Sequence, residues 1–392
     1  MTDNTATSVA PVPLDPIREG EPVLSVRDLK VSFRTDDGVV NAVDGVSYDL
    51  YPNEVLGIVG ESGSGKSVTS LAVMGLLPKS AKVEGDIVFR GQDLLHMPES
   101  GRRKLRGGRM AMVFQDALAA LNPVFTVGAQ IEEAIASHQP AMNGNAKRKL
   151  AVDLLELVGI PNPEARVDQY PHEFSGGMRQ RAMIAMSIAN EPDVLIADEP
   201  TTALDVTIQA QVLEVLERIQ ERTNTAIVLI THDLGVIAGV SDRVLVMYAG
   251  RPVETGTVDE IFYAPRHPYT LGLLASLPRL DLGDSSERLY RIKGQPPSLI
   301  FVPSGCPFHP RCDYARLPSP CATDRPALRS VAHVYGPHSS ACHLAGELGG
   351  VTADSLHADV GAEFELAEDA AALSPAETDA LGQLSTPLEQ EP

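Results

Sequence analysis

The segment Gly60-Glu-Ser-Gly-Ser-Gly-Lys-Ser67 decides the fold of this chain, because it joins a short apolar run to a helical pattern. The run VLGIVG (residues 55–60) leads into it, and SVTSLAVMGLL (residues 67–77) continues from it up to Pro78. The segment fits the pattern G-x-x-x-x-G-K-S/T, whose glycines let backbone N–H groups wrap around phosphate oxygens. The N-terminus of the following helix favours negative charge at the same place. The sequence therefore predicts a strand, a phosphate loop and a helix, which together indicate an α/β fold.

The side chains of this phosphate loop (residues 60–67) have separate expected roles. Lys66 is placed to reach the β- and γ-phosphates of ATP, and the Ser67 hydroxyl is placed to bind Mg²⁺. The alternative is a glycine-rich turn that binds no ligand. We expect the following consecutive residues to contact ATP: Gly60, Glu61, Ser62, Gly63, Ser64, Gly65, Lys66, Ser67 and Val68.

A second motif, DVLIADEP (residues 193–200), is an apolar strand that ends in two carboxylates. Asp198 is the expected second anchor for Mg²⁺. Because successive side chains on a strand point in opposite directions, Glu199 projects elsewhere, toward the place of an attacking water. Glu199 is therefore the candidate base for that water. Lys66 is also expected to be a catalytic residue. Two solvated acids at a strand end are the alternative interpretation.

The rest of the chain divides into regions of different pattern. Apolar runs alternate with helical patterns over residues 21–264, with an antiparallel pair near residues 23–50 and a helical lobe at about 117–190. The helix after DVLIADEP should bury a face made of Ile208, Val212, Val215, Leu216 and Ile219. Residues 265–345 are rich in Pro, His and Cys and predict a small second domain. Residues 1–20 are expected to be a disordered leader, and residues 346–392 a disordered tail.

The charge of the chain argues against one class of partner. The net charge is −20, whereas a nucleic-acid-binding protein normally shows a basic face. Residues 346–392 contain eleven Asp or Glu residues and no Lys or Arg, so they supply much of that charge. We also find no signal-peptide pattern and no run of about 20 apolar residues, which indicates a cytosolic protein.

The segment Phe174-Ser175-Gly176-Gly177-Met178-Arg179-Gln180 narrows the family, because it resembles the signature sequence of ABC ATPases. Ser175 can cap the helix that follows, and the two glycines let backbone approach an anion. The resemblance implies that Ser175, Gly176, Gly177 and Met178 face ATP held by a second ABC ATPase subunit, which we expect to be a homologous heterodimer partner. A capped helix start after a Gly-Gly turn is the alternative.

The resemblance assigns roles to four further positions. Gln115 looks like the residue that contacts Mg²⁺ or the attacking water, and His232 looks like the one that contacts the γ-phosphate. Asp205 ends TTALD, which resembles the loop that communicates across the ATPase dimer. Phe33 has the spacing of the aromatic residue that stacks on adenine, although it could equally be a core residue.

The chain resembles most closely the ATPase subunits of bacterial dipeptide and oligopeptide importers. The resemblance lies in FSGGMRQRAMIAMSIA (174–189), QDALAALNPVFTVGAQI (115–131, with Ala117 where Pro is usual), HPYTLGLLASLP (267–278), KGQPPSL (293–299) and GCPFHPRC (305–312). It implies two membrane permease subunits, an extracytoplasmic peptide-binding protein and a place on the cytoplasmic face of the membrane. Importers of nickel and other solutes share parts of these motifs. A soluble ABC ATPase without a transport role is a further alternative.

All four cysteines, Cys306, Cys312, Cys321 and Cys342, lie within one C-terminal stretch. A cytosolic protein rarely forms disulfides, so the clustering favours a metal centre. The intervals of five, eight and twenty residues do not match the short C-x₂-C pairs of common zinc sites. The resemblance implies a four-iron (4Fe–4S) cluster, because some members of the group hold one here. Zinc and reduced structural thiols are the alternatives.

Overall fold

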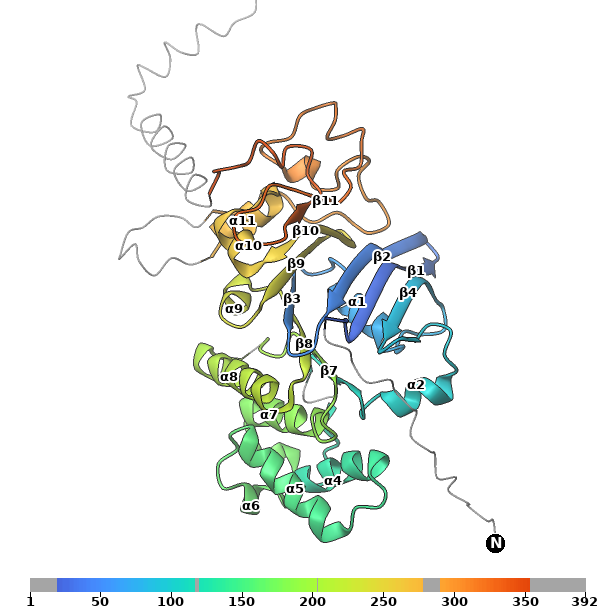
Figure 1. The fold of residues 1–392 in the computed structure, drawn as a ribbon, viewed down its shortest axis with the longest axis vertical. Coiled ribbons are helices and arrows are strands. Elements are labelled where there is room, and N and C mark those ends of the chain that lie inside the picture. Colours follow the sequence, from blue (N-terminus) through green and yellow to red (C-terminus); the bar gives the residue numbers. More distant parts are fainter. Residues whose placement is uncertain (1–19, 117–119, 203, 278–289, 353–392) are drawn as a thin grey trace, which may run out of the picture.

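The computed structural model describes residues 20–116, 120–202, 204–277 and 290–352. Its centre is an eight-stranded sheet with the strand order β11-β12-β10-β9-β3-β8-β7-β6 (Figure 1). Strands β9, β3, β8, β7 and β6 run parallel to one another, as in other α/β nucleotide-binding folds. Their bounds are β3 Val55–Val59, β6 Met110–Val113, β7 Val194–Asp198, β8 Ala226–Thr231 and β9 Arg243–Tyr248.

The central strands are covered on both faces, as the unbroken apolar runs predict. Along β3, Val55 and Val59 belong to one hydrophobic core, whereas Leu56 and Ile58 belong to the other. Every residue of β3, β7 and β8 is buried. The alternation of strand side chains thus divides the molecule into two cores, one on each face of the sheet.

The antiparallel region expected near the N-terminus is a separate four-stranded sheet with the order β2-β1-β4-β5. Its strands are β1 Leu24–Thr35, β2 Gly38–Leu50, β4 Ala81–Phe89 and β5 Gln92–Asp93. It encloses helix α1 (Lys66–Val73) together with the central sheet, and α2 (Glu99–Leu105) follows it (Figure 1).

The helical lobe lies between β6 and β7 in the sequence and projects from the end of the molecule opposite the C-terminal segment (Figure 1). It contains α4 Val127–His138, α5 Gly144–Leu157, α6 Pro163–Arg166, the 3₁₀ turn η1 Pro171–Glu173 and α7 Gly176–Ser187. Thr126, Asn143 and Ser175 cap α4, α5 and α7 by accepting a backbone N–H with their side chains. The lobe and the antiparallel sheet confirm the predicted fold class.

Helix α8 (Val206–Thr223) returns the chain to the central sheet, and α9 (Leu234–Ala238) follows β8. The buried residues of α8 are Val212, Val215, Leu216 and Ile219, as the helical spacing predicts. Ile208, expected on the same face, is only half-buried; it lies in the first turn of α8 and packs on Gly177.

The C-terminal region is continuous with the nucleotide-binding fold. It follows β10 (Arg251–Thr257) and contains α10 Val258–Tyr263, α11 Pro268–Ala275, the turn η2 His309–Arg311, β11 Arg329–Ser330 and β12 Ser339–Ser340. Strand β12 pairs with β10 and so extends the central sheet. Ile292 and Phe308 also enter the core on one face of that sheet.

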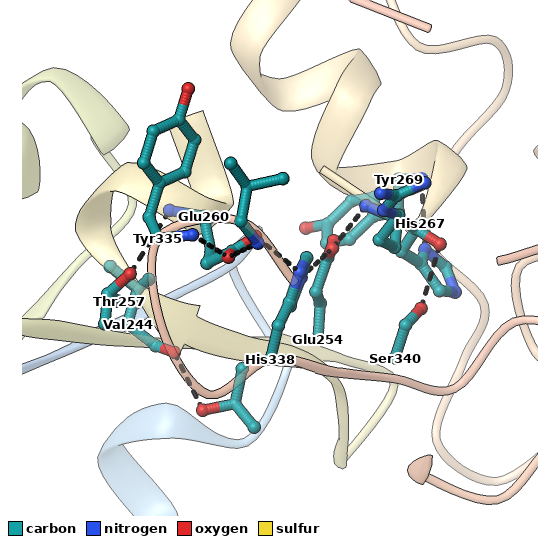
Figure 2. A network of polar contacts seen from close by, with 12 residues as sticks. Val244, Glu254, Thr257, Glu260, His267, Tyr269, Tyr335, His338 and Ser340 are labelled. Carbon is teal, nitrogen blue, oxygen red and sulfur yellow. Dashed lines mark hydrogen bonds and ion pairs between the residues drawn. The ribbon is translucent and has the colours of Figure 1, made fainter. Parts of the chain in front are cut away.

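A buried polar network ties this region to β10 and α10 (Figure 2). The His338 ring lies between two carboxylates, with Nε2 2.8 Å from Glu254 Oε1 and Nδ1 3.1 Å from Glu260 Oε2. All three side chains are fully buried. Glu260 also accepts the backbone N–H groups of Tyr335 and Gly336. Since each of these partners would be costly to bury alone, the network requires the loop before β12 to dock here.

The prediction that a disordered tail begins at residue 346 places its start too early. Leu348 is only 3% exposed and packs against Leu271 and Ala275 of α11, with Val351 beside them. The packed chain therefore extends past residue 346, because one apolar side chain among the acidic residues has a place in the core. Residues 1–19 of the leader expected at 1–20, Ala117 and residues 353–392 lie outside the described residues.

Candidate nucleotide site

A cavity of about 590 Å³ opens where the phosphate loop meets the ends of the central strands. Its walls are formed by Ala42, Glu61, Ser62, Gly63, Ser64, Gly65, Lys66, Ser67, Val68, Gln115, Glu199, His232, Leu273 and Leu299. The structure thus gathers residues from seven separate parts of the sequence around one space. Ala42, Leu273 and Leu299 have no polar group that indicates a nucleotide site, so the sequence patterns do not assign them to it.

The backbone of the phosphate loop requires glycine at two positions. Gly60 has φ 152° and Gly65 has φ 97°. A Cβ atom at Gly60 would lie 2.2 Å from the Met247 carbonyl oxygen, and one at Gly65 would lie 2.4 Å from the Ala42 carbonyl oxygen. Surrounding backbone therefore encloses the loop so closely that side chains at these positions cannot fit.

Lys66 is the first residue of α1 and points back over the loop. Its Nζ donates to the carbonyl oxygens of Gly60 at 2.7 Å and Glu61 at 3.1 Å. Burial lowers the pKa of Lys66, and the nearby carboxylates of Glu199 and Asp198 oppose this shift. The buried ammonium can exchange its two carbonyl partners for phosphate oxygens, which bind it more strongly.

Two of the three residues expected at Mg²⁺, Ser67 and Asp198, meet in the structure, whereas the third, Gln115, donates to Glu199. The Ser67 hydroxyl donates to Asp198 Oδ1 at 2.9 Å, although 130 residues separate them in the chain. Burial raises the pKa of Asp198, and the neighbouring charge of Glu199 adds to that rise. A buried carboxylate beside a hydroxyl is a hard oxygen donor pair that gains from a divalent cation, so these residues fit Mg²⁺.

Glu199 lies directly after β7 with φ 48°, a left-handed conformation that is unusual for a side chain of this size. Its Oε2 accepts hydrogen bonds from Gln115 Nε2 at 2.9 Å and from Thr202 Oγ1 at 2.8 Å. His232 Nδ1 lies 3.5 Å from the same oxygen. The arrangement holds one carboxylate oxygen at the cavity wall, where it can accept a proton from water. Thr202 escapes sequence reasoning because a threonine in TTALD has no distinctive pattern.

Other expected site residues lie away from this cavity. Phe33 lies on β1 and packs against the core shared with the antiparallel sheet. Ser175 caps α7 by accepting the Met178 N–H at 3.3 Å. Asp205 caps α8 by accepting the Ile208 N–H at 3.0 Å. These positions have a structural role in a single chain whatever else they do.

The two signature glycines differ in their surroundings. A Cβ atom at Gly177 would lie 2.4 Å from Cγ2 of Ile208, so this glycine allows α7 and α8 to approach each other. A Cβ atom at Gly176 would meet nothing within 4 Å. Gly177 is therefore needed for packing, whereas Gly176 faces open space.

Comparisons with known families agree with this geometry. A model described as "ABC transporter" matches residues 43–202, and one described as "Oligopeptide/dipeptide transporter, C-terminal region" matches residues 253–318. The dipeptide transport ATP-binding protein DppD of Bacillus subtilis is 57% identical over 294 residues, which are 74% of this chain and 87% of that protein. The chain belongs to the ABC transporter family. It is an ABC-type ATPase of the oligopeptide/dipeptide branch.

Two further comparisons place this ABC ATPase among its relatives. The oligopeptide transport ATP-binding protein OppD of Bacillus subtilis is 55% identical over 295 residues, covering 75% of this chain and 82% of that protein. The dimeric ATP-binding cassette MJ0796, solved with ADP and Pi, has a TM-score of 0.54 at 24% identity, covering 60% of this chain and 98% of that one. The second likeness concerns the fold alone. Within the described residues, no helix of the ATPase has the length and apolar content to cross a membrane.

The four cysteines of this ABC ATPase lie in a compact segment as free thiols. Backbone N–H groups donate to the sulfurs, from Arg316 to Cys321 at 3.4 Å and from Leu344 to Cys342 at 3.3 Å. Burial, together with a smaller effect of the neighbouring cysteine charges, raises the pKa values of Cys312 and Cys342 to about 12. In the described part of the chain, no three His, Cys, Asp or Glu side chains are arranged to hold a metal ion.

Proposed function

We propose that the chain powers the import of dipeptides or oligopeptides, as the ATP-hydrolysing subunit of a bacterial transporter. The observation that carries the ATPase part is the meeting of Gln115, Glu199 and His232 beside the phosphate loop. The cargo rests on the C-terminal region, which matches the oligopeptide/dipeptide transporter model, and on the printed functions of DppD and OppD.

In this proposal the described residues divide the work of hydrolysis. Lys66 binds the β- and γ-phosphates, while Ser67 and Asp198 hold Mg²⁺, which neutralises phosphate charge when bound. Glu199 accepts the proton of the attacking water, and the bonds from Gln115 and Thr202 keep its carboxylate in place. His232 contacts the γ-phosphate. Most of the rate then comes from positioning and electrostatic stabilisation. The adenine-stacking role of Phe33 stays a prediction.

The proposal includes a second ATPase subunit, which we expect to be a homologous partner rather than an identical one. The signature residues Ser175 and Gly176 lie at an open helix start that can meet the phosphates of a nucleotide bound to that partner. Asp205 stands at the start of α8, which packs on Gly177, and this contact supports its role in communication between subunits.

Two permease subunits complete the membrane part of the transporter in this proposal, with an extracytoplasmic peptide-binding protein supplying the cargo. Large apolar side chains stay exposed near Gln115 in the sequence: Phe114 by 41%, Val124 by 70% and Phe125 by 53%. Such a group favours a protein interface. We assign it to the permease subunits, which would hold the ATPase on the cytoplasmic face of the membrane.

Peptide uptake by vesicles that contain the complete transporter tests this function. We expect ATP-driven uptake of labelled di- and oligopeptides, and its loss when Lys66→Ala removes the phosphate-binding ammonium. Nickel and unrelated solutes are the matched competitors. Uptake of nickel without peptide uptake would reassign the cargo and leave the ATPase function intact.

We further propose that Cys306, Cys312, Cys321 and Cys342 hold one 4Fe–4S cluster. Two observations support it: the sulfurs of Cys321 and Cys342 each accept a backbone N–H, and the charges of the four thiols influence one another. Four cysteine thiolates are the usual ligands of such a cluster, and hydrogen bonds to sulfur and burial set its reduction potential. The cluster would join four separate parts of the loop, a structural contribution rather than a step in hydrolysis.

Anaerobic purification tests the cluster. We expect brown protein with about four irons per chain, if four thiolates bind one cluster, and a broad absorption near ~400 nm. The variant Cys312→Ser should lose iron and colour. Colourless protein with one bound zinc would favour the zinc alternative, and metal-free folded protein would leave structural thiols.

A further inference from the structure

An ion pair connects the C-terminal cysteine segment (residues 305–342) directly to the phosphate loop. Arg311 Nη1 donates to Glu61 Oε2 at 2.6 Å, and Nη2 donates to Glu61 Oε1 at 2.9 Å. Glu61 is the second residue of the phosphate loop and lines the cavity. Arg311 directly precedes Cys312, 250 residues away in the sequence.

The Arg311 guanidinium is also held by residues other than Glu61. Its side chain is 6% exposed, and Nε donates to the Lys293 carbonyl oxygen at 2.8 Å. It lies over the ring of Tyr248, with its central carbon 5.8 Å from the ring centroid, and Nη1 also donates to the Tyr248 hydroxyl at 3.3 Å. An arginine with this many partners is a rigid fork that can fix a carboxylate in one orientation.

The backbone of Glu61 is also held by the C-terminal region. Its N–H donates to the hydroxyl of Tyr269, on α11, at 2.8 Å. The rings of Tyr248 and Tyr269 pack against each other with centroids 4.7 Å apart. The first turn of the phosphate loop is therefore held by three contacts, two to Arg311 and one to Tyr269.

A carboxylate in this place needs such a partner. Glu61 lines the cavity that receives a triphosphate, and like charges at short range repel each other. Its charge also attracts the ammonium of Lys66, which lies close enough for the two to interact. Left unpaired, Glu61 would oppose the phosphates and compete with them for Lys66.

We propose that Arg311 is a positioning residue for ATP binding, which neutralises Glu61 and holds it away from the phosphates. ATP affinity then depends on the C-terminal cysteine segment, although that segment contributes no residue that touches the phosphates. The inference rests on the nucleotide-binding part of the proposed function and holds whatever solute the transporter carries.

Titration of the full-length chain with Mg²⁺ and a non-hydrolysable ATP analogue tests this role. We expect Arg311→Met to weaken binding about tenfold, or about 1.4 kcal/mol, because one uncompensated charge then faces the phosphates. The turnover number at saturating ATP should change much less than the KM. Added salt should reduce the difference in affinity between Arg311→Met and the wild type, because salt screens the unpaired charge of Glu61.

A double-mutant cycle separates this electrostatic role from simple packing. In a Glu61→Gln background, Arg311→Met should cause no further loss of affinity, because there is no charge left to neutralise. Arg316→Met is the matched control, since Arg316 lies in the same segment but pairs with exposed Glu347. It should bind the analogue as wild type does.

Three outcomes would overturn the inference. These are wild-type affinity in folded Arg311→Met, an equal loss in the Glu61→Gln background, and an equal loss in Arg316→Met. If Arg311→Met melts below the assay temperature, Arg311→Lys takes its place, because lysine keeps the charge and loses the fork; it should bind with intermediate affinity. A wild-type chain that binds no nucleotide would instead refute the nucleotide-binding function itself.

Discussion

Two glycine-rich helix starts in this chain differ sharply in their surroundings. The phosphate loop leads into α1, and the signature segment (residues 174–180) leads into α7. Both present backbone N–H groups at a helix N-terminus, where an anion can bind. The phosphate loop lines a cavity together with charged residues from other parts of the chain.

The phosphate loop is enclosed by its own chain. The Ala42 and Met247 carbonyls approach its glycines, Arg311 holds its carboxylate, and Lys66 is 4% exposed. At the signature segment, space around Gly176 is open, and Ser175 is exposed. The phosphate loop is thus enclosed by its own chain, whereas the signature segment is open, which agrees with the proposed second subunit.

Replacing the candidate base gives the largest effect expected at the enclosed site. Glu199→Gln should keep ATP binding and lower turnover by about 10²-fold or more, because an amide cannot accept the proton of the attacking water. The amide keeps the size of the side chain beside Gln115 and Thr202. Phosphate release and nucleotide binding, measured on the same preparation, check this. Turnover near the wild-type rate would refute the base assignment.

The signature segment is tested by adding a charge at Gly176, where an added Cβ atom would meet nothing within 4 Å among the described residues. Gly176→Asp adds a carboxylate at the first position of α7, where acidic side chains stabilise a helix. If the segment faces the phosphates of the partner's ATP, the new charge should reduce turnover of the assembled transporter about tenfold or more. Nucleotide binding by the isolated chain should be unchanged, because its own phosphate loop is intact.

Gly144→Asp is the matched control for this charge. Gly144 is also the first residue of a capped helix, α5, and a Cβ atom there also meets nothing within 4 Å. Both variants should melt at or slightly above the wild-type temperature, but only Gly176→Asp should lose turnover. An equal loss in both, or in neither, would contradict the proposal of a shared site.

Much of the enclosed site could be predicted because its signals are local. The apolar run before the phosphate loop predicts β3, and the glycine spacing predicts the turn into α1. The two acids of DVLIADEP follow the pattern of a strand end, and Asp198 does meet Ser67. Patterns of neighbouring residues therefore determine the elements, and the known order of motifs joins them.

The unpredicted parts depend on contacts between distant residues. Nothing near Arg311 or Glu61 in the sequence indicates that they pair, because the contact depends on how the C-terminal region packs on the sheet. The same packing buries Leu348, which looks like part of an acidic tail. The cysteine segment lies far from the phosphate loop in the sequence, whereas the fold places Arg311 beside the loop.

The smallest effect concerns Asp205, whose side chain caps α8 at Ile208. Because Gly177 of the signature segment packs on Ile208, a cap that fixes Ile208 also supports the signature segment. Asp205→Ala should cost about 1 kcal/mol of folding free energy, the usual value of a lost N-cap, and denaturant unfolding measures it. Asp205→Asn should cost almost nothing, because Asn caps a helix as well as Asp does. The Asn variant therefore separates the two roles of the residue.

If Asp205 communicates between subunits through its charge, Asp205→Asn should keep its stability and still lose several-fold turnover in the assembled transporter. Wild-type turnover in Asp205→Asn, with reduced turnover in Asp205→Ala alone, would mean that the residue acts only as a cap.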